Sequence, residues 1–262
     1  FEQQSMITLS DINDKIIADY LAEQSYSLYS VRIKALLKAY GGYKGLIDVW
    51  YQIKDNVTAY IVRYGGEFIA DLLPGADVEE IINLCKMAGG TVLLCSPVYN
   101  EYNSILGAVM SVNPPLLHSG SFCSADCSFT PEVNPTDYYS LLLQCNGAEF
   151  KAVSYEDFVA DLSHRMRKDT AVLMGCYLEN RLISCAAATA VYKCGAVIAG
   201  VATLPSYREK GLATAVVTML CKKLFRNGVE KIYLQRDKNK NYSLYNNIGF
   251  ENIGDFQQVE LL

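Results

Sequence analysis

The chain has 262 residues, of which 51% are hydrophobic, and its formal net charge is −5 at pH 7. This length suits two domains of ordinary size, and the apolar content excludes a disordered chain. The negative charge argues against a general nucleic-acid-binding protein, no apolar run is long enough to span a membrane, and no secretory signal pattern opens the chain.

Nine cysteines stand along the chain. Their odd number and apolar contexts indicate buried, reduced thiols rather than a disulfide framework, and therefore a cytoplasmic protein. Cys123 and Cys127 are the one close pair, and His118 lies shortly before them. A zinc knuckle there is conceivable, but the spacing of a four-ligand site is absent, so we predict no metal.

The first half predicts two helices, three strands, a helix and a further strand. Ser10 is a candidate N-cap for the first helical pattern, and Gly41-Gly42 ends the second. The expected helices are 7–29, 31–40 and 78–88, and the expected strands are 46–53, 57–64, 68–73 and 91–95.

Turn residues dominate the middle, from 111 to 136, including Asn113-Pro114-Pro115 and Asn134-Pro135. This composition is typical of a linker or an ordered surface loop. An amphipathic stretch over 137–144 and a capped helix over 154–165 open the second half. Strands at 173–178, 182–192 and 196–203, a helix ending at Arg226, a strand at 229–235 and a short helix at 241–247 follow. The order helix, helix, hairpin, strand, helix, strand thus occurs twice, which predicts two similar domains.

One turn in the second half has the chemistry of an anion cradle. The buried strand 196–203 leads through Leu204-Pro205-Ser206 to Arg208-Glu209-Lys210-Gly211-Leu212-Ala213, and a helix follows. The first N–H groups of a helix have no internal partner and carry the positive end of its dipole. Gly211 has no side chain, so a diphosphate can approach the backbone, while Arg208 and Lys210 add positive charge.

Arg208-x-x-Gly211-x-Ala213 after a strand resembles the R/Q-x-x-G-x-G/A motif of GNAT-family N-acetyltransferases. Leu244-Tyr245-x-x-x-Gly249-Phe250 resembles the L-Y-x-x-x-G-F signature of the same family, and order and spacing agree over roughly the last 110 residues. The resemblance implies an α/β (α+β) fold of two GNAT-like domains, each a mixed, mostly antiparallel twisted sheet flanked by helices. Residues 1–130 would be a degenerate copy and residues 131–262 the catalytic, acetyl-CoA-binding domain.

The resemblance also implies the site. The diphosphate of acetyl-CoA would lie on the backbone of Arg208, Glu209, Lys210, Gly211, Leu212, Ala213 and Thr214. The pantetheine arm would lie along Val201, Ala202 and Thr203, with the Val201 N–H as a one-donor oxyanion hole. Tyr245 would be the general acid, because a phenol stays protonated at neutral pH and can protonate a leaving thiolate; its alternative role is packing. Asn241 lies near the asparagine of the family, at a shorter spacing, as a further cofactor contact.

The general base is not identified by the sequence. The position where many family members carry a glutamate is Val197, which cannot accept a proton. Solvation or packing is a more common role than catalysis for Glu179, His164 and Cys194. The amine could lose its proton through water.

The sequence therefore predicts direct transfer of an acetyl group from acetyl-CoA to an amine of a small molecule, amino acid or peptide. The alternative is a non-catalytic acyl-CoA-binding or regulatory module that keeps the fold; an unrelated nucleotide-binding protein is not supported, because no G-x-x-x-x-G-K-S/T motif occurs. The first copy has Leu72-Leu73-Pro74-Gly75-Ala76-Asp77 where the second has its cradle, and Asp77, Glu79 and Glu80 would repel a diphosphate. Its role would be structural or to wall the substrate cleft. Neither a nucleic acid nor a membrane is an expected partner, and homodimer formation is left open.

Overall fold

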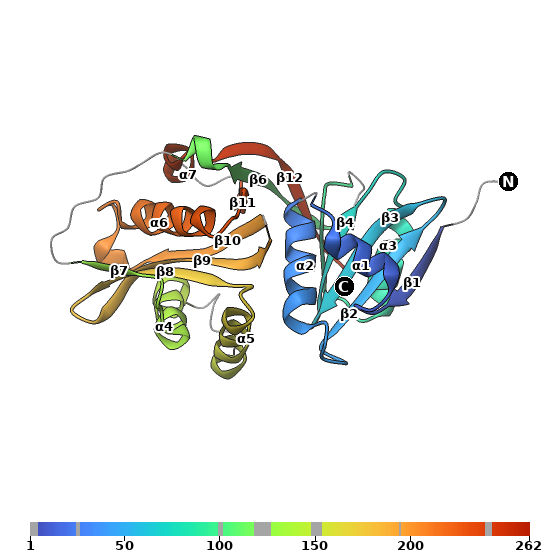
Figure 1. Ribbon diagram of the computed structural model, residues 1–262, viewed down its shortest axis with the longest axis horizontal. Helices are drawn as coiled ribbons and strands as arrows, with labels where there is room; N and C mark the ends of the chain where they lie inside the picture. The colour runs from blue at the N-terminus through green and yellow to red at the C-terminus, as the bar shows by residue number, and fades with distance from the viewer. Residues whose placement is uncertain are drawn as a thin grey trace. The chain divides into compact units, whose positions relative to one another are not determined.

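The computed structural model describes residues 5–24, 27–98, 102–117, 127–147, 154–193, 195–238 and 243–262. The chain divides into two compact units, one formed by Phe1–Val109, Arg236–Asn239 and Ile253–Leu262, the other by Met110–Gln235 and Lys240–Asn252. The C-terminal strand, from Ile253 on, thus belongs to the first unit (Figure 1). The expected domains 1–130 and 131–262 remain a prediction about the two copies of the repeated element order. The compact units divide the chain at other residues.

The first unit is built on a sheet in the order β1-β2-β3-β4-β5-β12-β6. Strands β4 and β5 are parallel, whereas the pairs β1–β2, β2–β3, β3–β4 and β5–β12 are antiparallel. The strands are β1 (Met6–Ser10), β2 (Ile47–Ile53), β3 (Val57–Tyr64), β4 (Glu67–Leu72), β5 (Val92–Cys95), β6 (Ser104–Val112), whose first part belongs here, and β12 (Glu251–Glu260).

Helices cover both faces of this sheet. They are α1 (Lys15–Ala22), α2 (Leu28–Tyr40) and α3 (Val78–Met87). Tyr20 of α1 stacks on Tyr60 of β3 with ring centroids 3.7 Å apart. The neighbouring Ile61 is buried in a cluster with Ile81 and Cys85 of α3. Because successive side chains of a strand point to opposite faces, α1 and α3 lie on opposite sides of β3.

The second unit has a sheet in the order β11-β10-β9-β8-β7, with β10 parallel to β11 and the other pairs antiparallel. Its strands are β7 (Ser128–Thr130), β8 (Val172–Leu178), β9 (Arg181–Tyr192), β10 (Gly195–Thr203) and β11 (Lys231–Asp237), of which the part up to Gln235 belongs here. Its helices are α4 (Pro135–Asn146), α5 (Tyr155–Arg167), α6 (Leu212–Arg226) and α7 (Ser243–Ile248), with 3₁₀ turns η1 (Pro114–Leu116) and η3 (Pro205–Tyr207). Helices α4 and α5 lie on one side of β8–β10 and α6 on the other (Figure 1).

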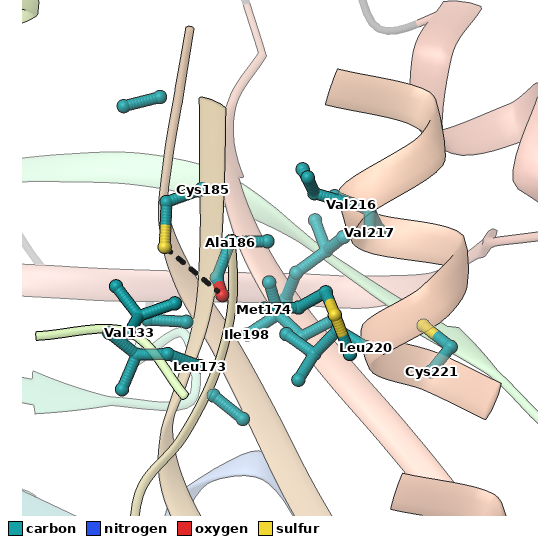
Figure 2. Close-up of a cluster of buried hydrophobic side chains, with 14 of the residues drawn as sticks. Val133, Leu173, Met174, Cys185, Ala186, Ile198, Val216, Val217, Leu220 and Cys221 are labelled. Atoms are coloured by element: carbon teal, nitrogen blue, oxygen red, sulfur yellow. Dashed lines mark hydrogen bonds between the residues drawn. The ribbon is translucent and has the colours of Figure 1, made fainter. Parts of the chain in front are cut away.

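The core of this unit follows the alternation of its strands. Met174 and Ala186 point toward Leu220 of α6, whereas their neighbours Leu173 and Cys185 point the other way (Figure 2). All of these side chains are buried. The sheet is therefore apolar on both faces, as expected where helices cover both sides.

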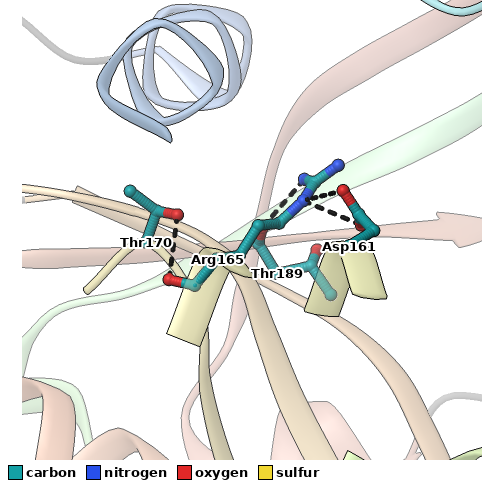
Figure 3. A network of polar contacts seen from close by, with 4 residues as sticks. All are labelled: Asp161, Arg165, Thr170 and Thr189. Carbon is teal, nitrogen blue, oxygen red and sulfur yellow. Dashed lines mark hydrogen bonds and ion pairs between the residues drawn. The ribbon is translucent and has the colours of Figure 1, made fainter. Parts of the chain in front are cut away.

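Local capping sets most helix starts. The side chains of Asp14, Ser27, Asp77, Asn134 and Ser154 accept hydrogen bonds from first-turn backbone N–H groups of α1 to α5. Helix α5 is also tied to the sheet at its C-terminal end. Arg165 Nε contacts the Asp161 carboxylate at 2.9–3.0 Å, and Arg165 Nη1 lies 3.5 Å from the Thr189 carbonyl oxygen. The Arg165 carbonyl oxygen accepts from the Thr170 hydroxyl (Figure 3).

The structure confirms the predicted fold class and the repeated order. Elements α1, α2, β2, β3, β4, α3 and β5 recur as α4, α5, β8, β9, β10, α6 and β11. In each copy the strand before the last helix is parallel to the strand after it.

Three sequence-based expectations were wrong. Residues from Met6 to Ser10 form β1, paired with β2, and the first helix starts only after its cap Asp14. The second helix starts at Leu28, behind a capping box made by Ser27 and Ser30. The middle was expected to be a linker or an ordered surface loop, but its described residues include regular elements: the end of β6, η1 and β7. Strands β6 and β12 were not predicted, because pairing with distant strands defines them rather than a local pattern.

Candidate functional site

Strand β10 diverges from its parallel neighbour part of the way along. The residues of β10 paired with β11 are Gly195 to Ile198, opposite Lys231 to Leu234, whereas β10 continues to Thr203. The register with β9 shifts between Ala199 and Ala202, so Gly200 and Val201 together lie opposite Ala186. Two residues opposite one make a β-bulge, which bends a strand and re-aims its backbone groups. The predicted pantetheine contacts Val201, Ala202 and Thr203 are in this segment.

Gly200 is required at the bulge for two reasons. Its φ is +64°, which only glycine adopts at little cost. A Cβ there would lie 1.9 Å from the hydroxyl oxygen of Tyr138. That hydroxyl donates a hydrogen bond to the Gly200 carbonyl oxygen at 2.7 Å. Tyr138 is 2% exposed, and burial raises its pKa well above the usual value, so the phenol stays protonated and acts as a donor.

Thr203, at the end of β10, is held by three side chains. Its carbonyl oxygen accepts from Arg208 Nε at 3.1 Å and from the Cys145 thiol at 3.3 Å. Its hydroxyl is 2.8 Å from that of Ser184, which also donates to the Ala202 carbonyl at 3.2 Å. Arg208 therefore fixes the loop to the strand end through Nε, while the residue itself is exposed.

The backbone turns sharply just before α6. Glu209 has φ +61° and Gly211, the N-cap, has φ +77° and ψ 1°. No side chain caps this helix, and its first turn has no acidic residue. Leu212 is buried, Ala213 and Thr214 are half-buried, and Glu209, Lys210 and Gly211 are exposed. Among the helices of eight or more residues that the structure describes, α6 alone lacks a side-chain cap. The first N–H groups of a helix have no partner within the helix, so an anion could accept hydrogen bonds from them.

The matching helix of the first unit is different. The Asp77 carboxylate accepts from the Glu80 N–H at 3.0 Å, and Glu79 and Glu80 are in the first turn of α3. Gln52 of β2 donates from Nε2 to the Glu80 carboxylate at 2.7 Å and accepts from the Asp77 N–H through Oε1 at 2.9 Å. This helix end already carries its own anions and would repel a diphosphate.

The C-terminal signature of the second unit has a structural basis at Tyr245, Gly249 and Phe250. Tyr245 in α7 is half-buried, and its ring meets that of Phe250 edge-on at 5.9 Å. Phe250 is 2% exposed. Gly249 has φ +108°, and a Cβ there would lie 1.9 Å from the Leu116 carbonyl oxygen of η1. The absence of a side chain at Gly249 thus allows its backbone to lie close to η1. Asn241 lies outside the described residues.

The candidates for a base are dispersed. Val197 is fully buried, Glu179 is exposed in the β8–β9 turn with φ +47°, and His164 is half-buried on α5. Cys194 lies outside the described residues, as do His118 and Cys123. Within the part of the chain that the structure describes, no group of three or more His, Cys, Asp or Glu side chains could hold a metal ion.

Three residues at β10 were not predicted from the sequence: Tyr138, Cys145 and Ser184. Tyr138 and Cys145 come from α4 and Ser184 from β9. The amphipathic pattern of 137–144 indicates a buried face, but not the contact of one phenol with a carbonyl 62 residues away. This part of the site depends on how α4 packs on the sheet.

Comparison with known proteins identifies the second unit. Residues 136–250 match the model of the Acetyltransferase (GNAT) family. No curated protein sequence matches the chain. In the described residues, no helix is both long and apolar enough to cross a membrane.

Solved structures resemble the chain over nearly its whole length. A tandem GNAT protein from the clavulanic acid biosynthesis pathway has a TM-score of 0.65 and 13% identity, with 99% of each chain covered. A Drosophila protein has a TM-score of 0.72 at 9% identity, covering 97% of this chain and 98% of that one. A GNAT-family acetyltransferase from Colwellia psychrerythraea has a TM-score of 0.60 at 14% identity, covering 97% and 99%. Residues 136–250 are therefore a domain of the GNAT acetyltransferase family, within a chain that has the fold of the tandem GNAT proteins.

Proposed function

We propose that this protein transfers an acetyl group from acetyl-CoA to an amine of a small molecule, amino acid or peptide. The observation that carries the proposal is the start of α6: a helix end without a side-chain cap, behind two left-handed residues, next to the strand segment Ala199–Thr203 that extends beyond its pairing with β11. Helix N-termini of this kind bind phosphate groups through backbone N–H donors and the helix dipole.

Different residues would bind the cofactor, stabilise the oxyanion and protonate the leaving group. The backbone from Arg208 to Thr214 would hold the diphosphate, with charge from Lys210 and the exposed guanidinium of Arg208. The Val201 N–H would donate to the thioester oxygen as negative charge develops there. Acetyl-CoA supplies the acyl group; the amine nitrogen bonds to the carbonyl carbon, the carbon–sulfur bond breaks, and Tyr245 would protonate the sulfur. We assign the amine proton to water, because no described side chain at β10 is an evident base.

A non-catalytic acyl-CoA-binding module is the second candidate. The observation in its favour is Val197, which is buried on β10 and cannot accept a proton. In either case we propose that the first unit does not bind the cofactor, because Asp77, Glu79 and Glu80 occupy the start of its α3. A cytoplasmic location is supported by the seven described cysteines, all of which are free thiols. Homodimer formation stays a prediction.

The test is acetyl transfer to a panel of primary amines, amino acids and peptides. Free thiol release and the mass of each amine would be followed together. The proposed enzyme releases CoA in proportion to an acetylated amine. Tight binding of acetyl-CoA without transfer to any member of a broad panel would favour the binding module, and absence of binding would contradict both candidates.

A further inference from the structure

One tyrosine outside the sequence motifs contacts the peptide that carries the Val201 N–H. Tyr138 is on α4, and its hydroxyl donates to the Gly200 carbonyl oxygen at 2.7 Å. The acceptor is at the β-bulge, where Gly200 has φ +64°. The phenol is buried, and its ring is 5.9 Å from that of Phe158 on α5, which itself is fixed to the sheet through Arg165. The donor is thus held in place by two helices.

The covalent geometry of the peptide links this contact to Val201. The Gly200 carbonyl and the Val201 N–H belong to one peptide plane, and no cis peptide bond occurs in the described chain. In a trans peptide the C=O and N–H vectors point in opposite directions. A donor that fixes the direction of the Gly200 carbonyl therefore also fixes the direction of the Val201 N–H, on the side away from Tyr138.

A bulge glycine needs such a constraint more than an ordinary strand residue does. Glycine adopts left-handed and right-handed conformations with similar ease, so the peptide next to it can rotate. At the bulge the regular ladder of the sheet is interrupted, which removes part of the usual restraint. The Tyr138 hydroxyl supplies a hydrogen bond that is satisfied in one orientation of the carbonyl.

We propose that Tyr138 is a positioning residue for acyl transfer: its hydroxyl orients the Gly200–Val201 peptide so that the Val201 N–H faces the thioester oxygen. This inference rests on the proposed function of the same site. Tyr138 touches neither substrate nor the reacting atoms in this scheme, and it acts through the backbone of β10.

The variant Tyr138→Phe removes the hydroxyl and keeps the ring. Because a preorganised oxyanion donor is typically worth 10²–10³-fold in kcat, a donor that is present but less well oriented should cost about 10–10²-fold. The KM for acetyl-CoA should change by less than about threefold, since the diphosphate is held at α6. The matched control is Tyr177→Phe on β8. It removes a hydroxyl that donates at 3.1 Å to Asp137 of α4, the helix that also carries Tyr138, and it leaves β10 unchanged. It should keep the wild-type kcat.

A second measurement does not depend on turnover. In the wild-type protein, the amide proton and nitrogen shifts of Val201 are compared by NMR with CoA and with acetyl-CoA bound. An N–H that meets the thioester oxygen should shift between the two ligands, and in Tyr138→Phe this difference should shrink while that in Tyr177→Phe persists.

Three results would overturn the inference. If folded Tyr138→Phe keeps the wild-type kcat and the wild-type difference in Val201 shift between CoA and acetyl-CoA, this inference is wrong. The proposed function would still stand. An equal loss of kcat in Tyr177→Phe would show that the effect is a general loss of packing in α4. If wild-type protein transfers no acetyl group and its Val201 amide does not distinguish the ligands, the proposed function and this inference fail together. Should Tyr138→Phe fail to fold, the wild-type NMR comparison takes its place. The inference requires the Val201 N–H to face the thioester oxygen, so a Val201 amide that does not distinguish CoA from acetyl-CoA would overturn it.

Discussion

Three glycines of the second unit are fixed by three different physical requirements. Gly200 needs both a positive φ and room for the Tyr138 hydroxyl, Gly211 needs a positive φ at an uncapped helix start, and Gly249 passes the Leu116 carbonyl. Gly211 and Gly249 fall in motifs that the sequence displays. Gly200 does not, because its neighbour Tyr138 is distant in sequence.

At the same scale, Tyr245 can be tested as the acid that protonates the leaving thiolate. Tyr245→Phe keeps the ring that packs on Phe250 and removes one hydroxyl. General acid catalysis is typically worth 10²–10⁴-fold, so kcat should fall within about that range with little change in acetyl-CoA affinity. The measurement is steady-state kinetics over pH on an acceptor for which chemistry limits the rate. An unchanged kcat would mean that Tyr245 only packs, and a loss confined to affinity would place it in the cofactor wall.

At the scale of elements, α3 and α6 occupy the same position in the two copies and begin in opposite ways. Helix α3 begins with Asp77 as cap and two glutamates in its first turn, whereas α6 begins with Gly211 and no acid. Acidic side chains at a helix N-terminus stabilise the helix but compete with any external anion for the same donors. This difference supports our proposal that the anion site is in the second copy.

The prediction for this element compares two isosteric substitutions. Asn and Asp both tolerate left-handed φ better than other non-glycine residues, so Gly211→Asn and Gly211→Asp impose similar backbone strain. Only Asp adds a negative charge, and it should weaken acetyl-CoA binding by about tenfold or more relative to Asn. Isothermal titration calorimetry measures both, with thermal unfolding to confirm that both variants fold. Equal affinities in the two variants would contradict the cradle assignment.

At the scale of the whole molecule, the chain returns to the first unit at its C-terminal end. Residues Gln257 to Glu260 pair with β5, and Val259 is fully buried among first-unit side chains. Two of the buried cysteines, Cys85 and Cys95, are in the same unit, and burial raises the pKa of each thiol to about 12.

The division of the chain into two units predicts which strands a new cavity will destabilise. Val259→Ala should cost about 1–3 kcal/mol and lower hydrogen-exchange protection in the first unit, at Leu93 and Leu94 of β5, although residue 259 is far from them in sequence. The matched control is Val217→Ala on α6, equally buried, which should affect β8 and β9 instead. Loss of protection in β8 and β9 from Val259→Ala, with β5 unchanged, would refute this division.

The buried thiols predict a loss of stability in alkali. Burial raises the pKa of Cys85, Cys95, Cys176 and Cys221 from 9.0 to about 12. Between these values the unfolded chain has lost the protons that the folded chain keeps, so the free energy of unfolding should fall as pH rises from about 9 to 12 and should be unaffected by these groups below 9. Urea denaturation across this range checks the slope. Cys221→Ala removes one such thiol and should reduce it, and an identical slope in the variant would exclude that contribution.

The sequence by itself determined what depends on neighbours along the chain. The repeated order of elements, the turn from Arg208 to Thr214, the acidic start of α3 and the Leu244–Phe250 signature were all predicted, because caps, turns and periodicity are local properties. The tertiary structure decided what depends on pairing and packing between distant segments. Residues Met6 to Ser10 are a strand because β2 offers hydrogen bonds to them, β12 joins β5, and Tyr138 reaches Gly200 because α4 packs on β10. Such contacts form only when a whole sheet assembles, and no short stretch of sequence contains both partners.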